Sequence, residues 1–598
     1  MTISPFAAGT YARDLNTSRL LDMKGQLDSL SRQLTTGRTS ETYAGLGAGR
    51  TTSLTARSQI SALDGYAAGI TNAGTRLSLA TTSIQQVQKL ATSTWTELDV
   101  NRSGSEGSAR ANLRTLATSR FGTALDALSQ NVAGSYLFSG RATTTPPVEE
   151  AGIILDGDAA AGLAGVATLI RERQSADLGT GSPATGRLLL AGAGTGIGLS
   201  ESADPGVRAN FGFTIEAATS TNPGALGVVL TPGSAASAAF SFAGQPKEGD
   251  LVRVTVENQD GSQSLVDLRA SSDPKAGAGT FLIGASAAES AANLRGALGG
   301  AVVTGAQSGT PPGVAVVLSG GSAASAAVTV AQQPVAGDSV KITLGMRDGT
   351  TRTLTLTAAT KAGGANTFVI GATAAETAGN LRTALGTALD AAATTDLAAS
   401  AATRAADDFF AGSGSAGLSP RRVVTDAAGN ATGFAADPGG RTVIWYKGDD
   451  TSSDPRTTTT VQISANQTVG IGAQANEAAL RGALAGIAVM ASVSFDGATT
   501  DDARFQAYAT RIQAQVKPTD GSQTLEQIAT EFGLAASTVA TQKADNAATK
   551  SILQSAIDGV ESASMEEVAT KLMTLQTQLQ ASYQTTSTLA KLTLANYL

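Results

Sequence analysis

Apolar side chains recur at spacings of three and four residues near both ends of the chain. One stripe is formed by Leu20, Met23, Leu27, Leu30 and Leu34. The other is formed by Val568, Leu572, Leu575, Leu579 and, in the same frame, Leu589. This a/d heptad pattern is typical of a helix that buries one narrow face against another helix. We therefore expect a long helix near each end.

Local signals indicate where these helices begin and end. Ser564, followed three residues later by Glu567, is the pattern of a capping box, which starts a helix. Gly37 follows the first stripe, and glycine commonly ends a helix.

A longer heptad pattern follows the glycine-rich stretch 43–50. Its main positions lie seven residues apart: Leu63, Ile70, Leu77, Ile84, Ala91 and Leu98. Its predicted companion positions are weaker: Ile60, Ala67, Gly74, Thr81, Gln88 and Trp95. The pattern predicts a rod-like helix from about Thr51, and a returning helix over residues 113–132.

The middle of the chain changes to short runs of Val, Thr, Leu and Ile separated by Gly, Asp and Pro, which is typical of strands. It also repeats. Residues 233–239 recur unchanged at 321–327, an offset of 88. Within each repeat we expect a β-hairpin and then a helix, at 283–295 in the first and 370–382 in the second. The repeat predicts two tandem α/β modules.

These patterns together predict an α+β protein: a long α-helical coiled-coil bundle from both termini with a β-rich insert. The predicted domains are a helical core at 1–142, a linker and β-rich domain at 143–228, outer modules at 229–316 and 317–403, a β-rich return segment at 404–474, and a second helical core at 475–598.

Composition removes several classes of function. The chain has no histidine and no cysteine, so the commonest general base, the thiol nucleophile and the usual transition-metal ligands are absent. The net charge of −7 argues against a nucleic-acid binder. No window has the ~20 apolar residues of a membrane span. We expect no enzyme, no cofactor, no metal site and no membrane insertion.

Two further kinds of pattern carry no chemistry. The alternating glycines of 192–198 do not match a dinucleotide fingerprint, and those of 45–49 lack the lysine of a P-loop. The acidic pairs at 149–150, 449–450 and 501–502 are adjacent residues, whereas a glycosidase needs two carboxyls facing across a cleft. We interpret both as turns and solvated surface.

The heptad stripes leave two alternatives open. An antiparallel bundle within one chain would explain the 60–98 and 113–132 pair. The stripes at the two ends have no neighbouring helix to cover them locally, which favours burial against other subunits. The predicted assembly interface comprises Leu20, Met23, Leu27, Leu30, Leu34, Leu63, Ile70, Leu77, Ile84, Val568, Leu572, Leu575, Leu579 and Leu589.

Three stretches resemble the bacterial flagellin superfamily, which includes flagellin and the hook-associated protein of the hook–filament junction. Residues 31–38 (SRQLTTGR) are similar to the family's S-x-x-L-x-T-G stretch. Residues 134–140 (GSYLFSG) are closer to the junction protein. Residues 568–598 resemble the C-terminal helix of the family. The resemblance covers about 1–142 and 475–598, while the repeats resemble inserts of long alphaproteobacterial flagellins.

The resemblance implies a D0/D1-type core of terminal helices that stacks into a tube, with the insert displayed outside. It implies export as an unfolded chain through the flagellar type III channel, without a cleaved signal peptide. The expected location is the extracellular flagellum. The expected partners are copies of the chain or other flagellins, hook-associated proteins, and the export apparatus with its chaperone.

Three functions follow as expectations. The first is a filament subunit that serves motility, and the second is the junction protein. A surface adhesin or type III translocator with a helical stalk is a third, and it would not need both terminal helices in one assembly core.

Overall fold

The computed structural model describes residues 5–102, 107–414, 417–435, 440–452, 454–495, 501–518 and 521–595. It is 48% helical and 22% strand, which confirms the predicted mixture of helix and sheet. The chain forms two compact units. Unit 1 comprises Met1–Thr75, Val461–Val469 and Ala536–Leu598; unit 2 comprises Arg76–Thr460 and Gly470–Ala535.

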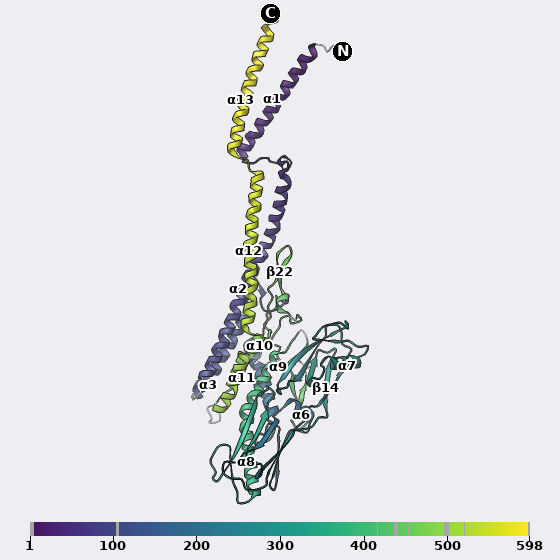
Figure 1. Ribbon diagram of the computed structural model, residues 1–598, viewed down its shortest axis with the longest axis vertical. Coiled ribbons are helices and arrows are strands. Elements are labelled where there is room, and N and C mark those ends of the chain that lie inside the picture. The colour runs from purple at the N-terminus through teal and green to yellow at the C-terminus, as the bar shows by residue number, and fades with distance from the viewer. Residues whose placement is uncertain are drawn as a thin grey trace. The chain divides into compact units, whose positions relative to one another are not determined.

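Unit 1 is almost entirely helical (Figure 1). It contains α1 (Pro5–Thr36), the 3-10 turn η1 (Tyr43–Leu46), α13 (Met565–Ala595), the first half of α2 (Gly49–Val100), most of α12 (Leu525–Glu561), and most of the hairpin of β21 (Thr460–Ser464) and β22 (Gln467–Gly470). Helix α1 stops where predicted, because Gly37 adopts a φ of 68°.

Helix α2 contains the long heptad pattern. Its buried row is Ile70, Ala73, Leu77, Ala80, Ile84, Val87, Ala91, Thr94 and Leu98. The main positions from Ile70 onwards are therefore as predicted, but the companion row lies one residue earlier than predicted. The observed companion row consists of the smaller side chains Ala73, Ala80, Val87 and Thr94. The predicted companion Trp95 lies next to this row and is half-buried.

The helices of unit 2 cluster around α10 (Ala478–Ser492), which contacts α3, α5, α9 and α11. The bounds of the others are α3 (Gly107–Leu128), α4 (Ala151–Asp156), α5 (Val166–Leu178), α6 (Pro205–Asn210), α9 (Ala398–Phe410) and α11 (Asp501–Val516), with short turns η2 (Ala393–Leu397) and η3 (Pro455–Thr458). A Cβ on Gly486 of α10 would lie 2.8 Å from Val516 Cγ2, so glycine permits α10 and α11 to approach closely.

One sheet of unit 2 has the strand order β12-β11-β10-β13. Its strands are β10 (Leu251–Glu257), β11 (Gln263–Ser271), β12 (Thr280–Leu282) and β13 (Val302–Ser308). Helix α7 (Ala287–Ala297) and the paired strands β9 (Ser237–Phe242) and β14 (Val314–Ser319) complete it. Together they enclose a core that includes Val252, Val254, Phe281 and Leu294.

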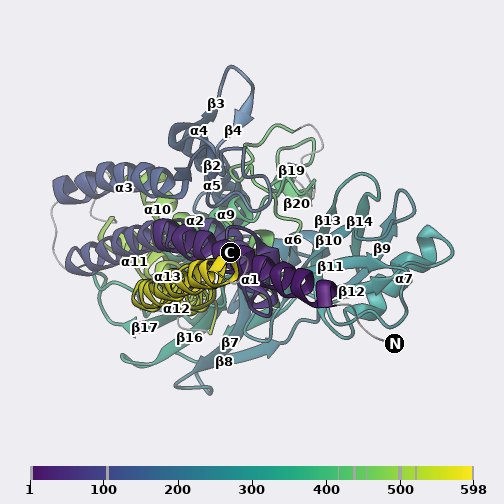
Figure 2. The ribbon, with the colours of Figure 1, turned by 90° about the horizontal axis from the view of Figure 1, so that it is seen from above.

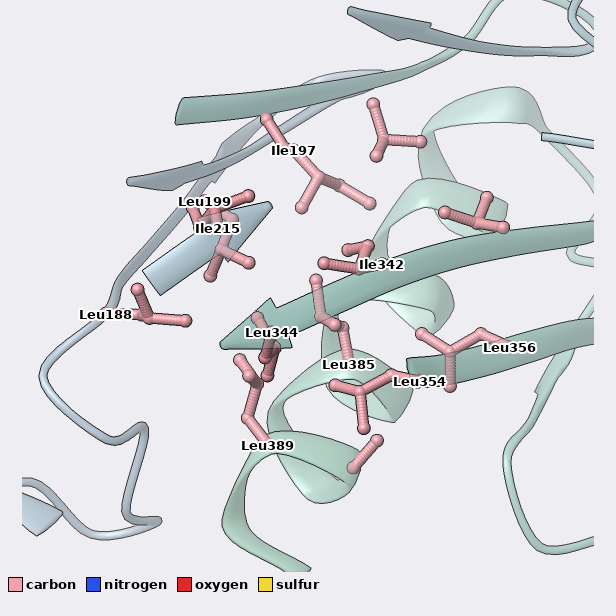
Figure 3. Packing of buried hydrophobic residues seen from close by; sticks show 14 of the residues in the cluster. Leu188, Ile197, Leu199, Ile215, Ile342, Leu344, Leu354, Leu356, Leu385 and Leu389 are labelled. Atoms are coloured by element: carbon pink, nitrogen blue, oxygen red, sulfur yellow. The ribbon is translucent and has the colours of Figure 1, made fainter. Parts of the chain in front are cut away.

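The second sheet has the order β18-β17-β16-β7. Its strands are β7 (Thr214–Ser220), β16 (Ser339–Gly345), β17 (Thr351–Ala359) and β18 (Thr367–Val369), with α8 (Ala374–Ala392) following. A further sheet joins β5 (Leu189–Ala193), β6 (Gly196–Ser200), β15 (Ser325–Val330) and β8 (Leu226–Thr231). Both contribute to a larger core around Ile342, Leu344 and Leu389 (Figure 3).

The helices that follow the two sheets, α7 and α8, are capped at their N-termini by equivalent hydrogen bonds. Ser286 caps α7 by accepting a hydrogen bond from the Glu289 N–H, and Thr373 caps α8 by accepting one from the Glu376 N–H. Each glutamate in turn accepts a hydrogen bond from the backbone ahead of its cap, at 2.7 and 2.8 Å. These are reciprocal capping contacts of the capping-box type.

The two cores do not coincide with the predicted modules 229–316 and 317–403. Strands β7 and β8 belong with β15–β18, although all of β7 and half of β8 precede the predicted start of the first module. Strands β9–β14 form the other group. In Figure 2, these strands lie to one side of β7, β8, β16 and β17. The sequence repeat marks which segments are alike, but strand pairing decides which segments fold together.

The remaining strands are short. They are β1 (Asn131–Val132), β2 (Ser135–Tyr136), β3 (Gly157–Asp158), β4 (Leu163–Ala164), β19 (Arg422–Thr425) and β20 (Ala431–Ala435). Residues 443–446, within the predicted β-rich return segment 404–474, form no regular strand. Tyr446 instead makes one isolated bridge with Val148, and the buried Trp445 donates from Nε1 to the Phe410 carbonyl at 2.8 Å.

Leu389→Ala should destabilise the second sheet by about 2–5 kcal/mol, because Leu389 is fully buried and the cavity left behind adds to the lost transfer free energy. Hydrogen exchange of the β16 and β17 amides measures this. The control is Val335→Ala, whose side chain is 65% exposed and should cost less than ~0.5 kcal/mol. Equal loss of protection in β10 and β11 would contradict two separate cores.

Candidate assembly interface of the terminal helices

Helices α1 and α13 pack against each other within unit 1. Val568 and Leu575 of α13 are buried, whereas Leu572 and Leu579 are half-buried. All five predicted positions of α1, Leu20, Met23, Leu27, Leu30 and Leu34, are also half-buried. The two stripes are thus brought together, and a single chain covers them only in part. The side chain of Leu589 lies outside the described residues.

Other large apolar side chains of these two helices face solvent. Leu21 is 64% exposed, Met573 is 68% exposed and Tyr583 is 60% exposed. None of the three belongs to the predicted stripes. Apolar surface of this kind on long helices is typical of a site where another protein packs.

The chain segments between the helices pair with each other at the base of α1 and α13. Arg38 and Ser562 form an antiparallel bridge. The Thr39 N–H donates to the Glu561 carbonyl at 2.7 Å, and the Ala563 N–H donates to the Gly37 carbonyl at 2.9 Å. The stretch that resembles flagellin, residues 31–38, therefore ends directly in this joint.

A carboxylate holds the joint to α2. Glu561 accepts hydrogen bonds from the Ser53 hydroxyl at 2.5 Å and from Arg57 at 2.7 and 3.1 Å. The bond from Arg57, and then that from Ser53, lower the pKa of Glu561 below its ordinary value. The two-pronged contact with Arg57 fixes direction as well as distance.

Sequence reasoning missed this carboxylate. Arg57 and Glu561 are 504 positions apart, and neither stands in a recognisable motif. The predicted helix start is confirmed beside it, since the Glu567 N–H donates to Ser564 Oγ at 3.4 Å.

The predicted interface residues of α2 fall into two groups. Leu63 is half-buried and Ile70 is buried within unit 1. Leu77 and Ile84 belong to unit 2 and are fully buried there. Ile70, Leu77 and Ile84 are therefore core residues of one chain and present almost no surface to a neighbouring subunit.

One cluster of buried charges in unit 2 centres on Asp408. Asp408 accepts two hydrogen bonds from Arg421, both at 2.8 Å, and one from Arg173 at 3.1 Å. Burial alone would raise the pKa of Asp408, but these guanidinium groups hold it below its ordinary value. This arrangement keeps the Asp408 side chain in its carboxylate form, whereas burial raises the pKa of the neighbouring Asp407 to about 6.

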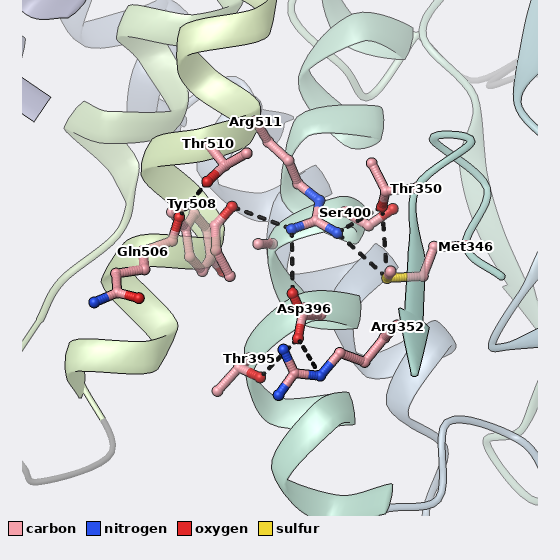
Figure 4. A network of polar contacts seen from close by, with 12 residues as sticks. Met346, Thr350, Arg352, Thr395, Asp396, Ser400, Gln506, Tyr508, Thr510 and Arg511 are labelled. Atoms are coloured by element: carbon pink, nitrogen blue, oxygen red, sulfur yellow. Dashed lines mark hydrogen bonds and ion pairs between the residues drawn. The ribbon is translucent and has the colours of Figure 1, made fainter. Parts of the chain in front are cut away.

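A second network centres on Arg511 (Figure 4). Its guanidinium bonds Asp348 at 2.6 Å and Thr350 at 2.7 Å, and it lies 3.7 Å from Asp396. It thereby ties α11 to the β16–β17 hairpin and to η2. A cavity of about 430 Å³ lies beside it.

Over the described residues, no group of three acidic side chains is placed to hold a metal ion. No helix in that part of the chain is both long and apolar enough to cross a bilayer. Comparison with known families found no family model that matches the chain, and comparison with curated proteins found no match.

Acidification should weaken the joint between α1 and α13. The pKa of Glu561 is lower in the folded protein than its ordinary value of 4.5, so its contribution to stability is present above about pH 4.5 and is lost as the pH falls through the folded value. The protection factors of the Thr39 and Ala563 amides, measured by hydrogen exchange and corrected for intrinsic rates, should fall accordingly.

Glu561→Gln should lower the same protection at pH 7 by roughly two- to tenfold, because a neutral amide binds Arg57 less strongly. At pH values below the folded pKa of Glu561, the variant and the natural chain should converge. Glu566→Gln, an exposed position on the first turn of α13, is the matched control. If the protection factors of the Thr39 and Ala563 amides change neither with pH nor in Glu561→Gln, this carboxylate does not hold the joint.

Proposed function

We propose that this protein is a structural subunit of the bacterial flagellar filament, which self-assembles through α1 and α13 and displays its sheets outside. The observation that carries the proposal is the pair of long helices whose apolar rows are only half covered in one chain. Two of the three sequence stretches that resemble flagellins, those that begin at Ser31 and Val568, lie on or beside these helices.

The energetics favour assembly by coupled burial. Leu21, Met573 and Tyr583 expose apolar surface that a neighbouring subunit would remove from water. Burial contributes roughly 25 cal/mol for each Å² of apolar surface. Because each subunit repeats the same contacts, small gains per contact add up along a polymer.

The proposed partners follow from the same resemblance. They are further copies of this chain or other flagellins, hook-associated proteins, and the type III export apparatus with its chaperone. The proposed location is the extracellular filament. The chain is free of cysteine, so no disulfide would have to be undone before threading through a narrow export channel.

Met573→Asp should prevent polymerisation without unfolding the monomer. Its side chain is 68% exposed, so a charge there is tolerated in one chain, but would be buried without a partner in the assembly. Sedimentation and electron microscopy measure polymer, and circular dichroism measures helix content.

The matched control is Val335→Asp, which places the same charge on an exposed valine of unit 2. It should leave assembly unchanged. Leu575→Asp and Leu27→Asp should abolish assembly, and Leu575→Asp should also loosen α1 from α13, because Leu575 is buried. Normal filaments from Met573→Asp and Leu575→Asp together would contradict the proposal.

Immunogold microscopy of sheared flagella distinguishes the filament from the hook–filament junction. With antibody against residues 229–403, we expect label along the whole shaft. A single band beside the hook would identify a junction protein instead. Unlabelled flagella would favour a helical-stalk adhesin or translocator.

A further inference from the structure

The two repeats in unit 2 match element by element. With an offset of 88 residues, β7 corresponds to β13, β8 to β14, β9 to β15, β10 to β16 and β11 to β17. With an offset of 87, β12 corresponds to β18 and α7 to α8. The first repeat therefore runs from β7 to α7, and the second from β13 to α8.

Each sheet takes its edge strand from the other repeat. In the sheet of the first repeat, β10 pairs with β13 of the second repeat. In the sheet of the second repeat, β16 pairs with β7 of the first. Both pairings shift register at the corresponding place, between Thr255 and Val256 and between Thr343 and Leu344. Strands β7 and β13 thus fill equivalent positions in exchanged sheets.

The adjoining strands are exchanged in the same way. Strand β9 of the first repeat pairs with β14 of the second, while β15 of the second pairs with β8 of the first. The hydrophobic cores follow these pairings. One core combines Val252 and Val254 with Val303, and the other combines Ile215 and Leu226 with Ile342.

The exchange has a centre at two equivalent serines. Thr231 pairs with Ser325, Ser234 with Ser322, and Ser237 with Ser319, so the antiparallel register continues unbroken from one side to the other. At the centre the Ser234 N–H donates to the Ser322 carbonyl at 2.9 Å, and the Ser322 N–H donates to the Ser234 carbonyl at 3.2 Å. The two hydroxyl oxygens are 3.0 Å apart.

Glycine makes this crossing possible on both strands. A Cβ on Gly233 would lie 2.8 Å from the Ser322 carbonyl oxygen, and one on the equivalent Gly321 would lie 2.6 Å from the Ser234 carbonyl oxygen. Both contacts are with backbone and could not be relieved by a side-chain rotation. The identical stretches 233–239 and 321–327 are thus the segments that cross.

We propose that the two repeats are copies of one module whose first two strands, β7 and β8 in one copy and β13 and β14 in the other, have changed places within a single chain. In a module that had not exchanged, Ser237 would lie opposite Thr231 in the place that Ser325 occupies, and residues 232–236 would be a hairpin loop. Here that loop is opened into a strand-like crossing. Neither repeat is complete without the other, so the two bodies are interlocked.

Engineered disulfides in the full chain test this directly, because the chain has no cysteine of its own. Opposed residues of an antiparallel pair have Cα atoms about 4.5–5.5 Å apart, within the range of a disulfide. Thr231→Cys with Ser325→Cys should form an intrachain cross-link on oxidation. Thr231→Cys with Ser237→Cys should not, since six extended residues span about 20 Å.

Migration on a non-reducing gel separates the outcomes. An intrachain bond in the Thr231–Ser325 pair alone supports the exchange. A bond in the Thr231–Ser237 pair alone would show two tandem modules and overturn it. Dimers joined through the Thr231–Ser325 pair at low protein concentration would place the exchange between chains and would also overturn it. Fluorescence of the two tryptophans, of which Trp445 is fully buried, reports that each variant is folded.

Deletion of β7 and β8, residues 214–231, supplies a second readout. Exchange predicts that amides of β16 and β17, in the other repeat, lose at least tenfold protection from hydrogen exchange, while β10 and β11 of the same repeat keep theirs. Tandem modules predict the reverse. Loss in β10 and β11 with protection kept in β16 and β17 would therefore refute the proposal even if the cysteine variants failed to fold.

Discussion

Close approach of backbones is the constraint on which the rest of this structure depends. Apolar residues make up 42% of the chain but aromatic residues only 4%, so its cores are filled mainly with small and medium side chains. Such cores bury enough surface only where elements come near to one another. Gly486 provides this between α10 and α11, and Gly233 and Gly321 provide it where the two repeats cross.

The same constraint explains why unit 1 leaves apolar surface exposed. Two helices that meet along one narrow stripe cover that stripe only in part and leave its flanks open. Val568 and Leu575 are buried, whereas Leu21 and Met573 remain in solvent. In a polymer, the same helices of neighbouring subunits would cover these flanks. The joint around Glu561 would then orient the pair, because Arg57 binds that carboxylate in a fixed direction.

The interlocked repeats suit an exposed part of such a polymer. A module whose strands all come from one repeat can separate from its neighbour without breaking a sheet. Here the edge strand of each sheet belongs to the neighbouring body, so separating the bodies requires breaking two sheets at once. The hydrogen bonds between Ser234 and Ser322 hold the two segments together at the point where they cross.

Part of the candidate site could be predicted from local pattern. The stripes of α1 and α13 follow from side-chain spacing, and the ends at Gly37 and Ser564 follow from capping chemistry. The joint could not be predicted, since Glu561 meets Ser53 and Arg57 only through tertiary packing. Leu77 and Ile84 carry the same heptad signal as Leu63, yet unit 2 buries them completely. Spacing shows that a face is apolar, but not what covers it.

The sequence by itself determined the kinds of element, most of their positions and the existence of a repeat. Hydrophobic period, turn residues and caps are local properties, so the hairpins after Glu257 and Gly345 and the helices capped by Ser286 and Thr373 could be predicted from short stretches. Only the tertiary structure decided which repeat supplies each strand. Two copies with equivalent residues offer the same side-chain contacts whether or not they exchange, so pattern cannot distinguish the two arrangements. The difference lies in the path of residues 232–236 and 320–324, where backbone pairing replaces two turns.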